Sequence, residues 1–176
     1  MKKKYDDIKK ELLIGMKDML IGENVAAKYT EAGEDGYQVS MVHALIEELT
    51  EIGNDGLAEF FFMPETKGLE AYAILQSVVT FERELNMDTK AKFDAVANVI
   101  NFYLETGSFA GDIDGSNYSL KVSVMVPLDG ELATLKDIVN MNASQAILTA
   151  TAYCNLFIKV AEGDMTLDEV KELVRN

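Results

Sequence analysis

The sequence predicts an α+β domain in which an antiparallel sheet of four to five strands carries helices on one face. Three observations support this prediction. Apolar residues recur at helical spacing in several stretches, and two pairs of short, β-branched or aromatic stretches are joined by turn residues. Between residues 88 and 129 the apolar period also changes from 3.6 to 2, as in a helix that leads into a hairpin. No repeat, low-complexity tract or linker divides the chain, so residues 1–176 are expected to form a single domain.

Composition fits a globular protein and narrows the classes of partner. Of 176 residues, 48% are hydrophobic and 26% are charged, which is close to average. The net charge of -14 argues against nucleic acid and anionic membranes, because both need a basic surface. The same charge favours solubility and would suit a cationic partner segment. No apolar stretch reaches the roughly 18 residues that cross a bilayer, and no signal-peptide pattern follows the first lysines, so we expect a cytoplasmic location.

Two helices are predicted in residues 1–56. Residues 2–21 place their apolar side chains on one helical face, and Gly22 is a suitable C-terminal stop. Residues 25–29 could extend a helix towards the acidic, glycine-bearing loop at 31–36. Residues 39–52 form the second predicted helix because the following apolar residues recur at helical spacing: Val42, Leu45, Ile46, Leu49 and Ile52.

A β-hairpin is predicted next, with strands at residues 57–63 and 69–80 joined by a turn at 65–68. Both faces of each strand are apolar. The hairpin is therefore either covered on both sides or exposes one apolar face. In the first case the N-terminal helices would cover one of the two sides. We expect the exposed face to be a partner surface formed by four residues: Phe60, Phe62, Tyr72 and Ile74.

The central helix and a second hairpin follow. Asp88 is the expected N-cap, and the helix is expected to end at Gly107. Residues 112–117 resemble a calcium loop, but glycine is fourth rather than sixth, and position twelve is Ser123 rather than glutamate. A hairpin turn explains the segment better, with a strand of alternating apolar residues at 120–126 after it.

Three helical pieces are predicted at the C-terminal end. Residues 132–139 form the first, and a capping-box-like unit at Asn142 and Gln145 restarts the helix, which then continues to Glu162. Thr166 and Glu169 form the capping box of a last short helix.

No motif in the sequence assigns a reaction. His43 is the only histidine, and Glu47 and Glu51 would share its helix face, but a di-iron site needs two Glu-x-x-His units. Cys154 lies in an apolar helical run and is expected to be a buried core thiol. Phosphate loops and nucleophile elbows are absent. We therefore expect no enzyme, metal or cofactor, although an active site built from carboxylates alone remains open among the 30 acidic residues.

Several segments of the chain resemble the YbjN family, bacterial proteins described as sensory-transduction regulators with a fold similar to type III secretion chaperones. These segments lie at residues 57–65, 69–79, 100–109, 126–129 and 161–166. The resemblance spans residues 57–174, and it implies a chaperone-like core preceded by one N-terminal helix where two are predicted here. It also implies protein binding rather than catalysis, often with self-association, and it transfers no catalytic residue.

The sequence and the resemblance together lead to one main functional hypothesis and one alternative. The first is a non-catalytic, chaperone-like or regulatory protein that binds a peptide or protein segment. The alternative is a structural homodimer without a client, with the central helix or a hairpin as its interface.

Overall fold

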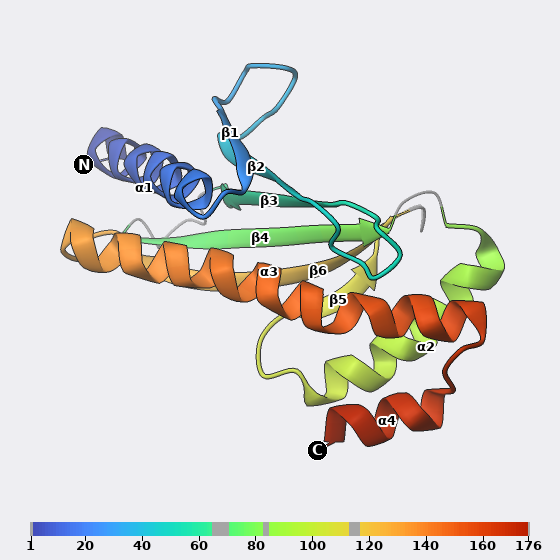
Figure 1. Ribbon diagram of the computed structural model, residues 1–176. Helices are drawn as coiled ribbons and strands as arrows, with labels where there is room; N and C mark the ends of the chain where they lie inside the picture. The colour runs from blue at the N-terminus through green and yellow to red at the C-terminus, as the bar shows by residue number, and fades with distance from the viewer. Residues whose placement is uncertain (1, 65–70, 83–84, 113–116, 176) are drawn as a thin grey trace.

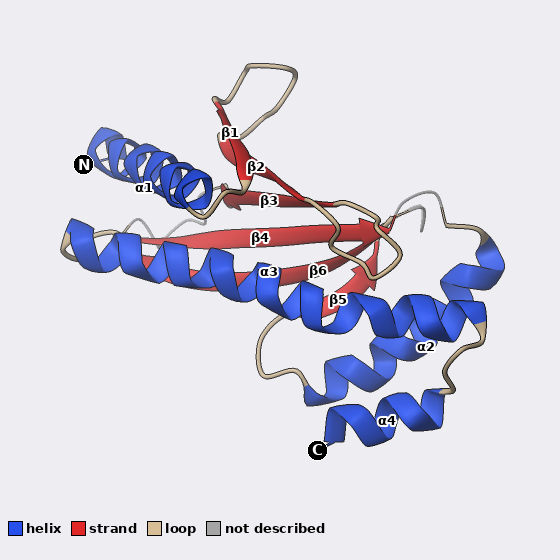
Figure 2. Cartoon of the chain, in the orientation of Figure 1, coloured by secondary structure: helices blue, strands red, loops and turns tan. Residues whose placement is uncertain are grey.

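The computed structural model describes residues 2–64, 71–82, 85–112 and 117–175, and in these residues four helices pack on a six-stranded sheet (Figures 1 and 2). The elements in chain order are α1 (Lys2–Gly22), β1 (Ala26–Thr30), β2 (Met41–Ile46), β3 (Gly56–Phe62), β4 (Tyr72–Glu82), α2 (Met87–Tyr103), β5 (Ser108–Gly111), β6 (Tyr118–Pro127), α3 (Leu132–Glu162) and α4 (Leu167–Arg175). The predicted α+β class is confirmed, with six strands in place of four to five.

The strands pair in the order β1-β2-β3-β4-β6-β5, and every pair is antiparallel. Burial alternates along β3 and β4, so that one face of the sheet is fully buried and the other is only partly covered. Helices α1 and α3 lie side by side on the buried face, α1 over β1 to β3 and α3 over β4 and β6 (Figure 1). No helix of the described residues lies on the opposite surface, which we call the helix-free face.

Five aromatic rings from five different elements meet where α3 crosses the sheet. They are Phe81, Phe93, Phe109, Tyr118 and Phe157, all at most 2% exposed. The ring of Phe157 lies at the centre, with its centroid 5.0 to 5.5 Å from each of the other four. Burial raises the pKa of the Tyr118 phenol, whose hydroxyl donates a hydrogen bond to Asp94. This cluster joins α2, α3 and three strands into one core.

The predicted helix at residues 39–52 is wrong, because residues 41–46 form β2 between β1 and β3. Val42 and Ala44 point to the buried face, whereas Leu45 lies on the helix-free face. With apolar residues on both faces, the strand lacks a clear alternation and matches a helical spacing by coincidence. The suggested helical extension at residues 25–29 is also wrong, since Ala26–Thr30 pairs with β2 as β1.

The predicted break in the C-terminal helix is wrong as well, because α3 runs without interruption from Leu132 to Glu162. Asn142 does not cap a new helix. It is 7% exposed, and its side-chain oxygen accepts a 2.6 Å hydrogen bond from the buried hydroxyl of Ser77 on β4. Asn142, which resembles a helix cap in the sequence, thus forms a buried hydrogen bond between helix and sheet.

The remaining helix ends agree with the sequence except at α2. The side chain of Asn86, rather than Asp88, accepts a hydrogen bond from the backbone of Thr89 and caps this helix. α2 ends at Tyr103, before Gly107, which has a φ of +83° and turns the chain into β5. The capping box at α4 is confirmed by reciprocal hydrogen bonds between Thr166 and Glu169.

Replacing Phe157 by leucine should lower the free energy of unfolding by about 1 to 2 kcal/mol, because a smaller side chain leaves four rings without their central contact. Chemical denaturation monitored by circular dichroism measures the change. Phe102→Leu is the matched control, since Phe102 is 81% exposed, and it should change the stability by less than about 0.5 kcal/mol. Equal effects of the two substitutions would contradict the central role of Phe157.

Replacing Ser77 by alanine should lower the free energy of unfolding by roughly 1 to 3 kcal/mol, because the amide of Asn142 then loses its buried partner. The double variant Ser77→Ala/Asn142→Leu removes both polar groups and should be more stable than Ser77→Ala alone. Urea unfolding of the three proteins checks this order. A double variant less stable than Ser77→Ala would show that the hydrogen bond is not the main term.

Candidate functional site

An apolar surface lies at the end of the helix-free face where β3, β4 and β6 meet. Met63, Ile74 and Met125 stand opposite one another in a row across three chain segments, and Tyr72 follows in the next row of β4. The Met125 side chain is 55% exposed, and Met63 and Tyr72 are exposed as well. We call these four residues the sheet-end patch. Exposed apolar side chains that adjoin in this way are typical of protein interaction surfaces.

The four residues predicted as a partner surface do not share one face. Tyr72 and Ile74 belong to the sheet-end patch. Phe60 and Phe62 point to the opposite, buried face, where they are 0% and 6% exposed. The expectation of a single face is therefore wrong for the two phenylalanines, because the register pairs Phe62 with Leu75, which points to the side of β4 opposite to Ile74. A partner role for Tyr72 and Ile74 remains a prediction.

A pocket of about 520 Å³ adjoins the sheet-end patch between α1 and the ends of β1 and β3. Phe62 and Leu13 contribute apolar side chains to its lining, and Met63 belongs to both the pocket and the patch. The acidic side chains of Asp6, Asp7 and Glu31 also line the pocket, together with the basic side chains of Lys9 and Lys10. The pocket therefore combines an apolar floor with a charged rim.

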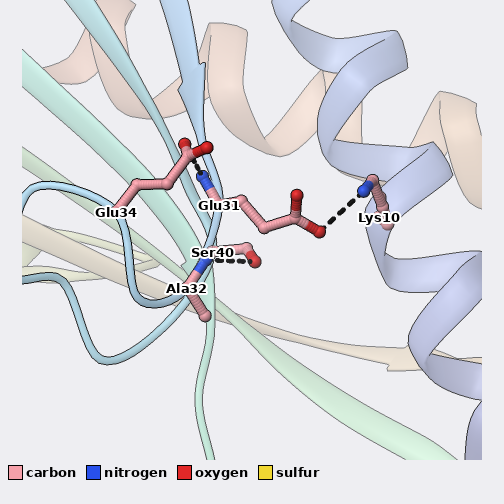
Figure 3. A network of polar contacts seen from close by, with 5 residues as sticks. All are labelled: Lys10, Glu31, Ala32, Glu34 and Ser40. Atoms are coloured by element: carbon pink, nitrogen blue, oxygen red, sulfur yellow. Dashed lines mark hydrogen bonds and ion pairs between the residues drawn. The ribbon is translucent and has the colours of Figure 1, made fainter.

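Polar contacts hold one wall of this pocket in place (Figure 3). The ammonium of Lys10 on α1 donates a 2.7 Å hydrogen bond to the Glu31 carboxylate, and this bond raises the pKa of Lys10. The backbone amide of Glu31 donates to Glu34, and that of Ala32 donates to the hydroxyl of Ser40. The ion pair connects the loop after β1 to α1, and the two backbone bonds order the loop itself along this wall.

Tyr29 also lines this pocket. Its hydroxyl is buried and has no hydrogen-bond partner within the described part of the chain. Leaving a buried hydroxyl without a partner is unfavourable by about 1 to 3 kcal/mol. Because this oxygen is shielded from solvent, a molecule bound in the pocket does not reach it in this conformation.

The structure brings no predicted catalytic or metal-binding set together. His43 lies on β2, with its Nδ1 atom 3.5 Å from the Glu59 carboxylate and its ring against Tyr37. Because residues 41–46 are a strand, no helix face aligns Glu47 and Glu51 with this histidine. Within residues 2–64, 71–82, 85–112 and 117–175, no three His, Cys, Asp or Glu side chains are grouped so that they could hold a metal ion.

The aspartate-rich turn of the second hairpin is described only at its two ends. Asp112 accepts hydrogen bonds from both the backbone and the side-chain amide of Asn117. Residues 113–116, on which the comparison with a calcium loop depends, lie outside the described residues. At its ends, the segment is closed as a hairpin between β5 and β6.

Cys154 is a buried thiol, as the sequence predicts. It is 0% exposed on the inner side of α3, and its sulfur donates a hydrogen bond to the backbone oxygen of Leu49. Burial raises the pKa of this thiol to about 11. The thiolate, which is the reactive form, is therefore scarce at neutral pH.

The folded protein should react with a thiol reagent such as dithiobis(nitrobenzoate) much more slowly than the same protein in denaturant. Because the pKa is raised, the thiolate fraction should increase only as the pH approaches 11. Absorbance of the released thiol, followed with and without urea, measures the difference. Rapid stoichiometric labelling of the folded chain at neutral pH would contradict the burial of Cys154.

The described part of the chain holds no helix with the length and hydropathy needed to cross a membrane. No protein-family model and no curated protein matches this chain. The resemblance to the YbjN family therefore stays a prediction.

Proposed function

We propose that this protein is a non-catalytic binding protein that holds an apolar segment of a partner protein on the sheet-end patch. The observation that carries the proposal is the row of Met63, Ile74 and Met125, three apolar side chains side by side on a face without a helix. Each Å² of apolar surface that a partner removes from water would stabilise the complex by about 25 cal/mol.

The neighbouring pocket favours an extended segment as the bound form. Met63 belongs to both the patch and the pocket, but Phe62 and Leu13 line the pocket on the helix-covered side of the sheet, so a bound chain would have to pass around the end of β3 to reach both. Such a combination of an apolar row and one pocket resembles the way extended peptides are recognised in grooves.

Charge supports a basic partner. Asp6, Asp7 and Glu31 outnumber the two lysines around the pocket, and the whole chain carries a net charge of -14. Lysine or arginine residues flanking the apolar segment would be attracted both at long range and at the pocket rim. The resemblance to the YbjN family, which implies protein binding, points in the same direction, and a chaperone-like or regulatory role in the cytoplasm belongs to this proposal.

Replacing Met125 by lysine should weaken binding of a basic apolar segment about tenfold, which corresponds to about 1.4 kcal/mol, because it puts a charge on the most exposed side chain of the patch. The probe is a fluorescent synthetic peptide that alternates leucine and threonine between flanking lysines. Fluorescence anisotropy measures its dissociation constant.

Met87→Lys is the matched control, because it adds the same charge at an exposed methionine on α2, away from the patch. It should leave the dissociation constant unchanged. Equal affinity of the two variants would exclude the sheet-end patch as the binding surface. A second peptide carries flanking glutamates in place of the lysines. If it binds as tightly as the lysine peptide, the partner is not selected by its positive charge.

A further inference from the structure

The long helix α3 contains an unusually uncharged segment. Residues 138–158 include no Asp, Glu, Lys or Arg, although such residues make up 26% of the chain. At 1.5 Å per residue, this segment runs for about 30 Å along the surface. A buried helix would explain the absence of charge, but α3 is buried on one side only.

The outer side of this segment is exposed and partly apolar. Met141 and Leu148 are each 67% exposed, and they lie two turns apart on one helical face. Ser144 and Gln145 lie between them and are exposed as well. Helix α3 lies at the front of the view in Figure 1, and the side-chain amide of Gln145 donates a hydrogen bond to the hydroxyl of Thr106 in the loop after α2. We call these four residues the outer face of α3.

We propose that the outer face of α3 binds a second copy of this chain, with the two α3 helices antiparallel and a two-fold axis passing between Ser144 and Gln145. Two-fold interfaces are the most common in homo-oligomers, and they require a surface that is complementary to itself. The outer face meets this requirement in both its pattern of side chains and its charge.

The two-fold axis is placed so that the two exposed apolar residues cover each other. With the axis at the midpoint between residues 144 and 145, Met141 and Leu148 lie about 5 Å along the helix on either side of it. In an antiparallel pair, Met141 therefore faces the partner's Leu148, and Leu148 faces the partner's Met141. The smaller Ser144 at the crossing point lets the two helices approach closely.

Electrostatics favours this face over the exposed leucine of α4. Two copies, each with a net charge of -14, repel one another, and the repulsion is greatest where acidic groups would be brought together. The other exposed leucine of the C-terminal helices, Leu173, lies in a hollow lined by Asp168, Glu169 and Glu172. The outer face of α3 allows contact between copies without burying a charge.

The extent of the face indicates a weak dimer. Stable interfaces bury about 800 Å² on each partner, and a single helical face provides only part of this area. We therefore expect a dissociation constant in the micromolar range, so that the dimer forms as the protein concentration rises.

A charge exchange tests the proposed pairing. Leu148→Glu and Met141→Lys should each raise the dimer dissociation constant at least about tenfold, because each buries a charge against an apolar partner. The double variant Met141→Lys/Leu148→Glu should recover dimerisation, since each lysine then faces a glutamate of the partner. Sedimentation equilibrium over a range of concentrations measures all three.

Two controls separate this geometry from general effects of charge or misfolding. Leu173→Glu adds the same charge at an exposed leucine on α4, and it should leave the dissociation constant unchanged. Gln145→Cys should form an intermolecular disulfide rapidly under mild oxidation because it lies next to the two-fold axis. Thr134→Cys at the helix start should not, and the buried Cys154 should not interfere.

Three results would overturn the proposal. The first is a wild-type chain that stays monomeric at all concentrations, which would leave the face to a different protein. The second is a double variant as defective as the single ones, and the third is equal weakening by Leu173→Glu and Leu148→Glu. Peptide binding at the sheet-end patch is measured separately, so neither proposal depends on the other.

Discussion

The contact of Phe157 with four other rings is the interaction on which the rest of the structure depends. Each ring comes from a different element, so this one cluster fixes α3 relative to α2 and to the strands β4, β5 and β6. Aromatic side chains bury large areas and prefer tilted or edge-to-face contacts, which constrain orientation as well as distance. Because β4 also carries Tyr72 and Ile74, the cluster indirectly positions the sheet-end patch on the other face.

The long α3 extends from this cluster to the opposite end of the sheet. Its inner side is lined by small residues, among them Ala143, Ala146 and Ala150, which let the helix lie close to the strands. The buried pair of Ser77 and Asn142 fixes its position along β4, since a shift by one turn would leave both groups unpaired. The helix is thus held by apolar contacts at one end and by a polar tie near its middle.

The sequence predicted the fold class and the two main hairpins because those strands contain many aromatic and β-branched residues between clear turn signals. It failed where local pattern and tertiary context conflict. The apolar residues of β2 match both a helical and a strand spacing, and Asn142 resembles a cap until the sheet supplies its partner. The candidate site was half predicted. Tyr72 and Ile74 were found from composition, but only the register decides which face of β3 holds Phe62.

The two proposed surfaces lie on opposite faces of the sheet, and this arrangement has a consequence for binding. Helix α3 covers the buried face, whereas the sheet-end patch lies on the helix-free face, so one copy can engage both partners at once. A dimer through α3 would then present two patches on a single particle. Two weak sites that bind the same partner chain raise the overall affinity through effective concentration, provided that the partner can span both. Because the dimer itself is expected to be weak, this gain would appear only at high protein concentration, and binding would respond to the abundance of the protein.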